Sequence, residues 1–483
     1  LEKIIQVPFE IPELDRVKVE NLFIGKVNAI IDDADITIST KYWNHIFKYC
    51  IKPYISTLRD INRVINVFQF KYYALKQETC LVDLLALTTI EVLEPDLYKW
   101  IRGNKHNLCK FQLSKPYIGE KKPDYMTIYT DEFQSLGLNV DKSIKSTATL
   151  FQSFNDDINK FYSNHESELE LRRQKRIAHP EKFDLYFSFD LDSVKVSKAE
   201  IENIINKYDK DSLRETIKSI IFSGNIKYLL DELISMVEQI PYNRLEIISK
   251  SIIDCTGYLE KINSTRSEIN SAVDLVFAIL KKIETEDERF EILYSSIQNI
   301  NIKAMSFFSF IINILDHAFG KIKYSPQIPE KQIVSSEQLD RIERRFLDKI
   351  YKINPPEAMF EILEFPFFLG EWETIDEEGQ YRFLSPLVLD KQFMLLFVCN
   401  LAYRWYGNGD GGWEFYDERY TKFVSDRQIY KTIQEWGKEN LYKFNKEEQI
   451  KLATFVLRYE SENDNFISES ETVKLLDKWN NEV

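Results

Sequence analysis

The chain has 483 residues, of which 44% are hydrophobic and 29% are charged, and its formal net charge is −14. This composition is typical of a globular protein of several domains, and the 14 glycines and 14 prolines are too few for the many turns of an all-β fold. The negative charge argues against a general affinity for DNA or anionic membranes, although a local basic patch is compatible with it.

The first residues and the cysteines indicate how the chain begins and in which compartment it works. Leu1–Pro12 contains no initiator methionine and no signal peptide, and we expect a short strand ending at Pro8 that continues a longer polypeptide. The five cysteines are scattered and form no C-x-x-C pair, which argues against disulfides and favours a cytoplasmic location. No apolar run approaches the length of a membrane span, and the most apolar window, Phe393–Tyr403, predicts a buried helix.

Residues 1–100 are expected to form a small bundle of helices. Apolar residues at helical spacing predict a first helix from Pro12 to about Asp32, and a second helix begins near Ser39. The segment Cys80–Val92 is almost continuously apolar, with Asp83 embedded in it. It predicts a buried helix that stops before Pro95.

The segment Ile51–Asn66 contains the most informative pattern of this bundle. Arg59 and Arg63 are four residues apart and share one face of a predicted helix that follows a Ser-Thr cap. Paired guanidinium groups near a helix start are suited to binding a phosphate. A solvated basic face beside Asp60 explains the same spacing equally well.

Residues 101–195 are expected to form a less regular connecting region. Lys115–Asp131 contains two prolines, a glycine and adjacent lysines, which predict a loop, and Phe151–Glu168 predicts a helix. A basic run then follows, formed by Arg172, Arg173, Lys175 and Arg176. Such a run usually marks an exposed, solvated face, and the alternative is a docking strip for a phosphate-rich or acidic partner.

Two helical regions complete the chain. Residues 196–354 are expected to form helical hairpins stacked as a solenoid or an irregular bundle. Three capping boxes mark helix starts there: Ser197–Glu200, Thr285–Glu288 and Ser335–Gln338. Residues 355–483 are expected to form an aromatic-rich helical domain, in which Gly407–Gly412 is a tight turn between Trp405 and Trp413. The predicted fold class is mainly α with little β.

No complete catalytic constellation is present in the sequence. The Gly-Lys pairs that begin at Gly25, Gly320 and Gly437 lack both the earlier glycine and the following Ser or Thr of a Walker A motif. The five histidines are far apart in sequence, so a histidine-based metal site is not supported, and His179 before Pro180 is expected to cap or pack a local turn.

Three segments together resemble the KAP family of P-loop NTPases, in the part that follows the nucleotide-binding sheet: Leu1–Pro12, Ile51–Asn66 and Leu81–Pro95. His179–Phe187 resembles a segment of bacterial members. The usual family sequence at the arginine helix is Thr-Pro-Arg-x-Ile-Lys/Arg-Arg. Here Leu58 stands in place of the proline, whereas Thr57, Arg59 and Arg63 remain.

The resemblance implies a function for the arginine helix. Arg59 would be a sensor of the terminal phosphates, carried by a helical lid, with Arg63 as its helper or structural partner. ATP and Mg²⁺ would be bound mainly by Walker A and Walker B residues upstream of Leu1, and the whole protein would be an ATPase. Many relatives have membrane helices inserted in the NTPase domain, and we expect none here.

The resemblance also implies a biological role. Soluble bacterial relatives are associated with antiphage defence, so we expect an ATP-driven switch or assembly subunit that forms a homo-oligomer and works with a second, effector subunit. A different class of function is a non-catalytic helical scaffold whose NTPase core is degenerate or absent. A third, a nucleic-acid effector, rests on the basic run and the aromatic content, and the net charge of −14 counts against it.

Overall fold

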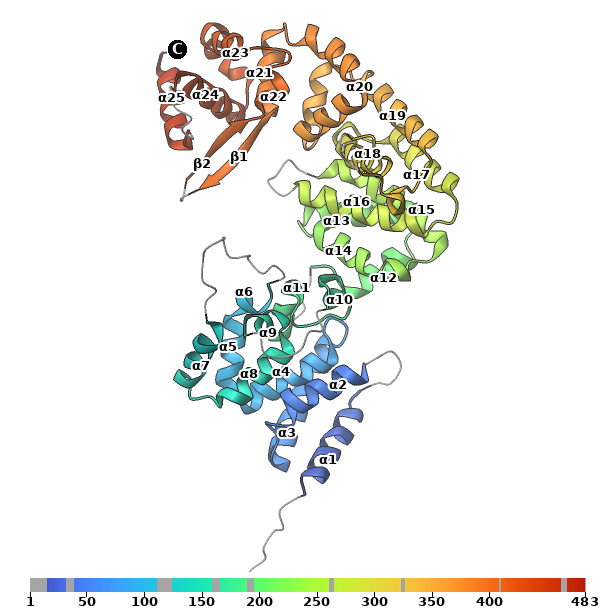
Figure 1. Cartoon of the computed structure of the whole chain (residues 1–483), viewed down its shortest axis with the longest axis vertical. Coiled ribbons are helices and arrows are strands. Elements are labelled where there is room, and N and C mark those ends of the chain that lie inside the picture. The colour runs from blue at the N-terminus through green and yellow to red at the C-terminus, as the bar shows by residue number, and fades with distance from the viewer. Residues whose placement is uncertain are drawn as a thin grey trace, which may run out of the picture. The chain divides into compact units, whose positions relative to one another are not determined.

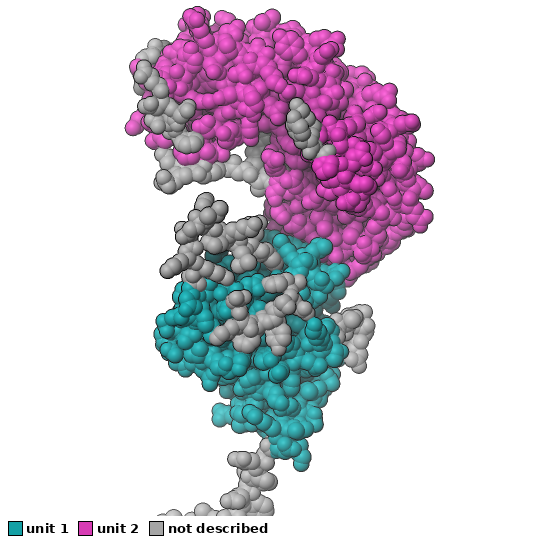
Figure 2. All heavy atoms as spheres, viewed as in Figure 1, with its two compact units in different colours: residues 1–201 teal, residues 202–483 magenta. Residues whose placement is uncertain are grey.

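The structure is a computed structural model, and it is mainly α-helical, as predicted (Figure 1). It describes residues 15–31, 39–110, 124–158, 166–188, 195–259, 265–322, 326–407, 410–461 and 467–482. The strand expected at the start of the chain lies outside these residues. The chain divides into two compact units, Leu1–Ile201 and Glu202–Val483, which Figure 2 colours separately. The finer boundaries expected near residues 100 and 354 stay predictions.

The first unit is built from short and medium-length helices. Its elements are α1 (Arg16–Asn28), α2 (Thr40–Ile46), the π-helical turn η1 (Phe47–Ile51), α3 (Leu58–Leu75), α4 (Leu81–Leu93), α5 (Pro95–Gly103), α6 (Lys105–Leu108), α7 (Tyr125–Ser135), α8 (Val140–Leu150), α9 (Gln152–Ile158), α10 (Glu168–Arg173), α11 (Pro180–Phe183) and the 3₁₀ turn η2 (Asp184–Phe187). Helix α12 (Lys198–Asn206) crosses the division between the units.

A single hydrophobic core runs through the first unit, from Val19 in α1 to Tyr186 in η2. Helix α4 is its centre, because every residue from Leu81 to Ile90 is buried. The buried helix predicted from the apolar run is therefore confirmed. It ends before Pro95, which occupies the first turn of α5, where the missing amide hydrogen costs nothing.

Two local predictions in this unit differ from the structure. The loop expected over Lys115–Asp131 is wrong in its second part, because α7 begins at Tyr125. Asp124 explains this start, since its side chain accepts a hydrogen bond from the amide of Thr127. The single helix expected over Phe151–Glu168 is α9 in its first half, and residues 159–165 lie outside the described part.

The second unit begins with a long series of helices. They are α13 (Lys210–Phe222), α14 (Ile226–Ser235), η3 (Val237–Gln239), α15 (Tyr242–Cys255), η4 (Thr256–Tyr258), α16 (Thr265–Lys282), α17 (Glu286–Asn299), η5 (Ile302–Ala304), α18 (Met305–Phe319), η6 (Pro329–Lys331) and α19 (Ser336–Ile350). The rest comprises η7 (Pro356–Glu361), α20 (Phe365–Leu387), α21 (Lys391–Asn400), β1 (Ala402–Gly407), β2 (Asp410–Phe415), α22 (Asp417–Tyr420), α23 (Asp426–Thr432), η8 (Ile433–Gly437), η9 (Lys438–Lys443), α24 (Lys446–Glu460) and α25 (Glu469–Glu482).

Helices α13 to α20 form two layers, which confirms the predicted stack of hairpins. In one layer α13 packs on α15, α15 on α17 and α17 on α19, and in the other α14 packs on α16, α16 on α18 and α18 on α20. Contact between every second helix is the pattern of an α-solenoid. The predicted helix starts are also found, since Ser197, Thr285 and Ser335 accept hydrogen bonds from the amides three residues later. At Ser335 the backbone amide also donates a hydrogen bond to the side-chain oxygen of Gln338, which completes the capping box.

A β-hairpin, which the sequence reasoning missed, replaces the turn expected at Gly407–Gly412. Strands β1 and β2 pair antiparallel from Ala402 opposite Phe415 to Gly407 opposite Asp410. A side chain at Gly412 would place its Cβ 2.2 Å from the carbonyl oxygen of Ile467, so only glycine fits there. The apolar window Phe393–Tyr403 is accordingly divided between the end of α21 and the start of β1.

One described segment, Ile302–Phe319, is long and apolar enough to span a membrane by length and composition. The expectation that no such run exists was wrong on this point. The segment is 67% buried inside the protein, as the core helix of a helical stack would be.

Candidate functional site

The start of helix α3 is fixed by a complete capping box. The Thr57 hydroxyl accepts a hydrogen bond from the amide of Asp60 at 3.1 Å, and the Asp60 carboxylate accepts one from the amide of Thr57 at 2.9 Å. The same carboxylate accepts from the amide and hydroxyl of Ser56. Partial burial opposes ionisation, but the hydrogen bonds from Ser56 and Thr57 outweigh it and lower the pKa of Asp60.

Arg59 lies in the first turn of α3, and its side chain is exposed. Because Asp60 is turned back onto the helix backbone, it does not pair with Arg59, and among the described residues none forms a hydrogen bond or ion pair with this guanidinium. Leu58 is the first residue of the helix, the position that best tolerates a proline. The helix start that the family pattern requires is therefore kept without its proline.

Arg63 is one turn further along and is anchored to the neighbouring helix. Its guanidinium donates a hydrogen bond to the carbonyl oxygen of Val92, near the end of α4, at 2.9 Å. Further along α3, Lys71 forms an ion pair with Glu91 at 2.5 Å, on the same part of α4. These contacts hold α3 against α4. Phosphate sensing by either arginine, and the role of Arg63 as a helper or structural partner of Arg59, stay predictions.

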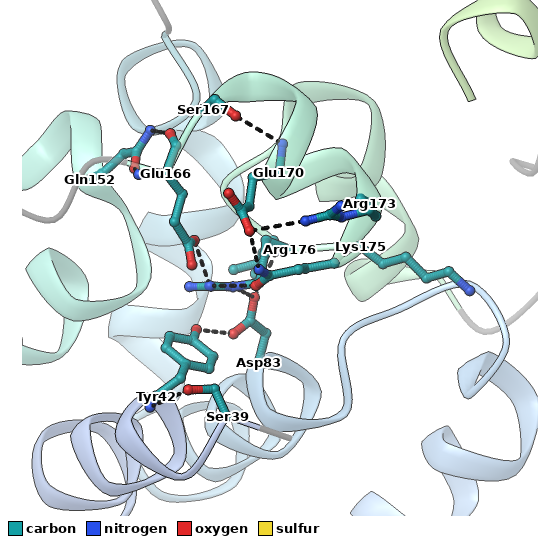
Figure 3. A network of polar contacts seen from close by, with 12 residues as sticks. Ser39, Tyr42, Asp83, Gln152, Glu166, Ser167, Glu170, Arg173, Lys175 and Arg176 are labelled. Atoms are coloured by element: carbon teal, nitrogen blue, oxygen red, sulfur yellow. Dashed lines mark hydrogen bonds and ion pairs between the residues drawn. The ribbon is translucent and has the colours of Figure 1, made fainter. Parts of the chain in front are cut away.

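A buried polar network lies at the other end of α4 (Figure 3). Asp83 is fully buried, and its carboxylate accepts hydrogen bonds from Nε of Arg176 at 3.0 Å and from the amide of Ile177 at 2.9 Å. The hydroxyl of Tyr42 donates a further hydrogen bond to it. Since a buried carboxylate is stable only when it is paired and hydrogen-bonded, these three donors explain how α4 carries an acid in its apolar face.

Arg176 joins the elements that surround Asp83. Its guanidinium also forms an ion pair with Glu166 at 2.7 Å, and its central carbon lies 3.6 Å from the centroid of the Tyr42 ring. Burial disfavours the charged guanidinium, but the nearby charge of Asp83 outweighs it and the pKa of Arg176 is raised. For Tyr42, burial itself raises the pKa of the phenol, so the hydroxyl stays protonated and can donate. The network therefore links α2, α4 and the segment after α10.

The local fold after α10 explains why the basic run divides. Lys175 has a left-handed backbone with φ of 56°, and its amide donates to the carbonyl of Arg172 while the amide of Arg176 donates to that of Leu171. This is a Schellman motif, which reverses the chain at a helix end. The turn directs Arg176 into the core towards Asp83.

The run is consequently partly inside the protein. Arg172 is buried and forms an ion pair with Glu181 at 2.5 Å, whereas Arg173 is exposed and pairs with Glu170 at 3.2 Å. Lys175 donates a hydrogen bond to the carbonyl oxygen of Gln77. Partner docking by Arg172, Arg173, Lys175 and Arg176 stays a prediction, and the two buried arginines could join it only if their ion pairs opened.

Sequence reasoning missed the pair formed by Asp83 and Arg176, which are 93 residues apart. The available signal was the acid within an apolar helix, because such a residue requires a cationic or hydrogen-bonding partner. The expectation for His179 is confirmed, since its Nδ1 accepts a hydrogen bond from the amide of Glu181 at the start of α11.

The described residues match only part of what a nucleotide with Mg²⁺ requires. An exposed arginine in the first turn of a helix fits a phosphate, both by charge and by its planar donor pair. In the part of the chain that the structure describes, no group of three His, Cys, Asp or Glu side chains could hold a metal ion. Among the described residues, Arg59 can therefore contact a phosphate, and no metal site made of three or more such side chains is present.

Comparison with protein families supports the resemblance of the N-terminal segments. Residues 1–75 match the model of the KAP family P-loop domain, and the match includes both Arg59 and Arg63. It covers the first 75 of the 483 residues. No curated protein and no solved structure matches the chain. The family match supports an NTPase-related protein that uses a nucleotide and Mg²⁺ in general terms.

Proposed function

From the match of residues 1–75 to the KAP family P-loop domain, we propose that this chain is the C-terminal part of a P-loop ATPase. In this proposal the ATP phosphates and Mg²⁺ are held mainly by residues upstream of Leu1. The first unit supplies a helical lid over them, and the helical stack of the second unit transmits the state of the lid.

In this proposal Arg59 is the residue that senses the terminal phosphate of the nucleotide. The observation that carries it is the exposed guanidinium in the first turn of α3, within the matched residues, beside an Asp60 whose carboxylate is engaged by the helix cap. Arg59 would donate hydrogen bonds to the terminal phosphate and stabilise the negative charge that develops there during transfer. Arg63, held by Val92, would keep this turn in place.

ATP turnover by the complete protein tests this role. Arg59→Ala is expected to lower kcat by about 100-fold or more, because a single donor to a developing charge contributes about that much. Arg102→Ala is a matched control, since Arg102 is also an exposed arginine at a helix end in the first unit. Equal turnover in Arg59→Ala and wild type would refute the sensor role.

The wider role follows from the resemblance. We place the protein in the cytoplasm of a bacterium, as an ATP-driven switch or assembly subunit of antiphage defence that forms a homo-oligomer and acts with a second effector subunit. The five free cysteines are compatible with a reducing compartment. If the complete protein neither binds nor hydrolyses ATP, the stack of helices is instead a scaffold that binds partners.

A further inference from the structure

A cavity within the second unit gathers positive charge. It lies between helices α13, α15 and α17, and its volume is about 510 Å³. Its charged lining residues are Lys210, Arg214, Lys218, Lys250 and Asp254. Four cations less one carboxylate give these residues a net charge of +3, within a chain whose total charge is −14.

Helix α13 supplies most of this charge. Lys210, Arg214 and Lys218 follow one another at intervals of four residues, so they project from one face of the helix. Lys250 lines the cavity from α15. The charge is therefore concentrated by helix geometry and by the stacking of α13 on α15, rather than by a run in the sequence.

Two lysines of the cavity, Lys218 and Lys250, form only weak ion pairs with neighbouring glutamates. Lys218 pairs with Glu215 at 2.8 Å and Lys250 with Glu246 at 2.7 Å, and both glutamates are largely exposed and outside the cavity lining. Exposed pairs of this kind contribute little free energy, because solvent screens them. Both ammonium groups can therefore exchange their glutamate for a ligand that the cavity encloses.

Arg214 has a donor that the described part of the protein leaves unused. Its guanidinium forms an ion pair with Asp254, while its Nε is buried and has no acceptor among the described residues. The Arg214 side chain is nevertheless 31% exposed and lines the cavity, so a ligand there can contact its guanidinium. The planar guanidinium is well matched to the oxygens of a phosphate group.

Protonation keeps the cavity cationic. Burial raises the pKa of Cys255 to about 11, so this lining thiol is neutral at physiological pH. Hydrogen bonds to Glu215 and Tyr258 raise the pKa of Lys218, so this side chain stays charged. Ser296 and Asn299 add neutral polar groups from α17.

We propose that this cavity binds a small molecule that carries a diphosphate group, either inorganic pyrophosphate or a nucleoside diphosphate. Each phosphate group has a charge of about −1.5 to −2 at pH 7, so two groups roughly balance the lining. The volume lies within the range of small-molecule sites. This binding site is separate from the nucleotide contact of Arg59 and does not depend on it.

The acidic lining of a second cavity, also formed by α15 and α17, argues against a longer polyanion such as nucleic acid. This cavity is lined by the first halves of α15 and α17, has a volume of about 360 Å³, and carries Glu246, Asp287, Glu288 and Glu291. Glu246 is one turn before Lys250, so the positive wall ends there. A nucleic-acid backbone would need a continuous basic track, whereas a compact diphosphate needs only the positive cavity.

Calorimetric titration of the complete chain with pyrophosphate and with ADP, together with hydrogen–deuterium exchange, tests the proposal. The expected result is saturable binding that protects residues 210–218, 250–258 and 295–301. The double variant Lys218→Gln/Lys250→Gln should weaken binding by about 100-fold, since each lost hydrogen bond from a charged group costs about tenfold or more. Tighter binding of ADP than of pyrophosphate would identify a nucleotide, and the reverse would identify the free anion.

The control variant is Lys99→Gln/Lys227→Gln. It removes the same total charge from the same kinds of pair, because Lys99 pairs with Asp96 three residues earlier and Lys227 with Asp231 four residues later. It should bind like the wild type. The proposal is overturned if neither ligand protects the three segments, or if both double variants lose affinity equally.

Discussion

The ion pair between Asp83 and Arg176 should be essential to the stability of the first unit. Changing Arg176 to Met keeps much of the side-chain volume but removes the cation. Among the described residues, Asp83 then keeps hydrogen bonds only from Tyr42 and the amide of Ile177, and it stays fully buried. Breaking one side of a buried pair costs about 3–5 kcal/mol, because an uncompensated charge remains. For a unit of about 200 residues this lowers the melting temperature by roughly 6–20 °C.

A double-mutant cycle separates the pair from its surroundings. Asp83→Leu should also be destabilising, since it leaves the buried Arg176 with Glu166 as its remaining ion-pair partner among the described residues and removes an acceptor of Tyr42. The double variant Asp83→Leu/Arg176→Met should be less destabilised than the sum of the two single variants, by about 1–3 kcal/mol. Arg173→Met serves as the control, because Arg173 is exposed and paired only within its helix, and it should change stability by less than about 1 kcal/mol.

The measurement is urea unfolding, monitored by hydrogen exchange with mass spectrometric detection. Peptides from α4 and from residues 171–186 report on the first unit separately from the second. Losses of under about 1 kcal/mol in both single variants, or losses that simply add in the double variant, would refute the reasoning from buried charge.

Two further predictions concern the helix cap and a buried acid. Leu58→Pro should leave the free energy of unfolding unchanged or raise it by up to about 1 kcal/mol, because Thr57 before it is already extended, with φ of −131° and ψ of 163°. The control Val64→Pro, inside the same helix, should lower the free energy of unfolding by about 3 kcal/mol or more. Equal losses for the two variants in urea unfolding would contradict this. Burial raises the pKa of Asp316 to about 8, above its value in the unfolded chain, so this proton stabilises the fold fully below about pH 4 and the contribution is lost as pH rises towards 8. Asp316→Asn should therefore flatten the fall in unfolding free energy between pH 5 and 8, a fall of at most about 1.4 kcal/mol per pH unit for one group. The control Asp96→Asn, at an exposed carboxylate of the first unit, should leave that slope unchanged.

Features set by neighbouring residues could be predicted from the sequence. The starts of α17 and α19 follow from Thr285 and Ser335, since a cap acts within one turn, and the burial of α4 follows from its apolar run. The arginine helix was recognised for the same reason, because Arg59 and Arg63 are one turn apart and are preceded by a Ser-Thr cap.

Features set by distant residues could not be predicted in this way. Nothing near Arg176 in the sequence indicates that the turn at Lys175 directs it to Asp83, since the pairing depends on how the segment after α10 lies against the start of α4. The cationic cavity is also a product of helix stacking. The hairpin β1–β2 is a different case, because Asn408-Gly409 between two aromatic-rich segments is a strong local signal of a two-residue hairpin turn, and it was overlooked.

The layered arrangement of α13 to α19 has a consequence for how the protein is made. The main contacts of each of these helices are with helices one or two places away along the chain. Proteins dominated by such local contacts fold quickly, and their segments need not wait for the distant end of the polypeptide. This part of the chain should therefore acquire structure progressively during translation, so that a ribosome stalled after α17 would display a folded group of helices.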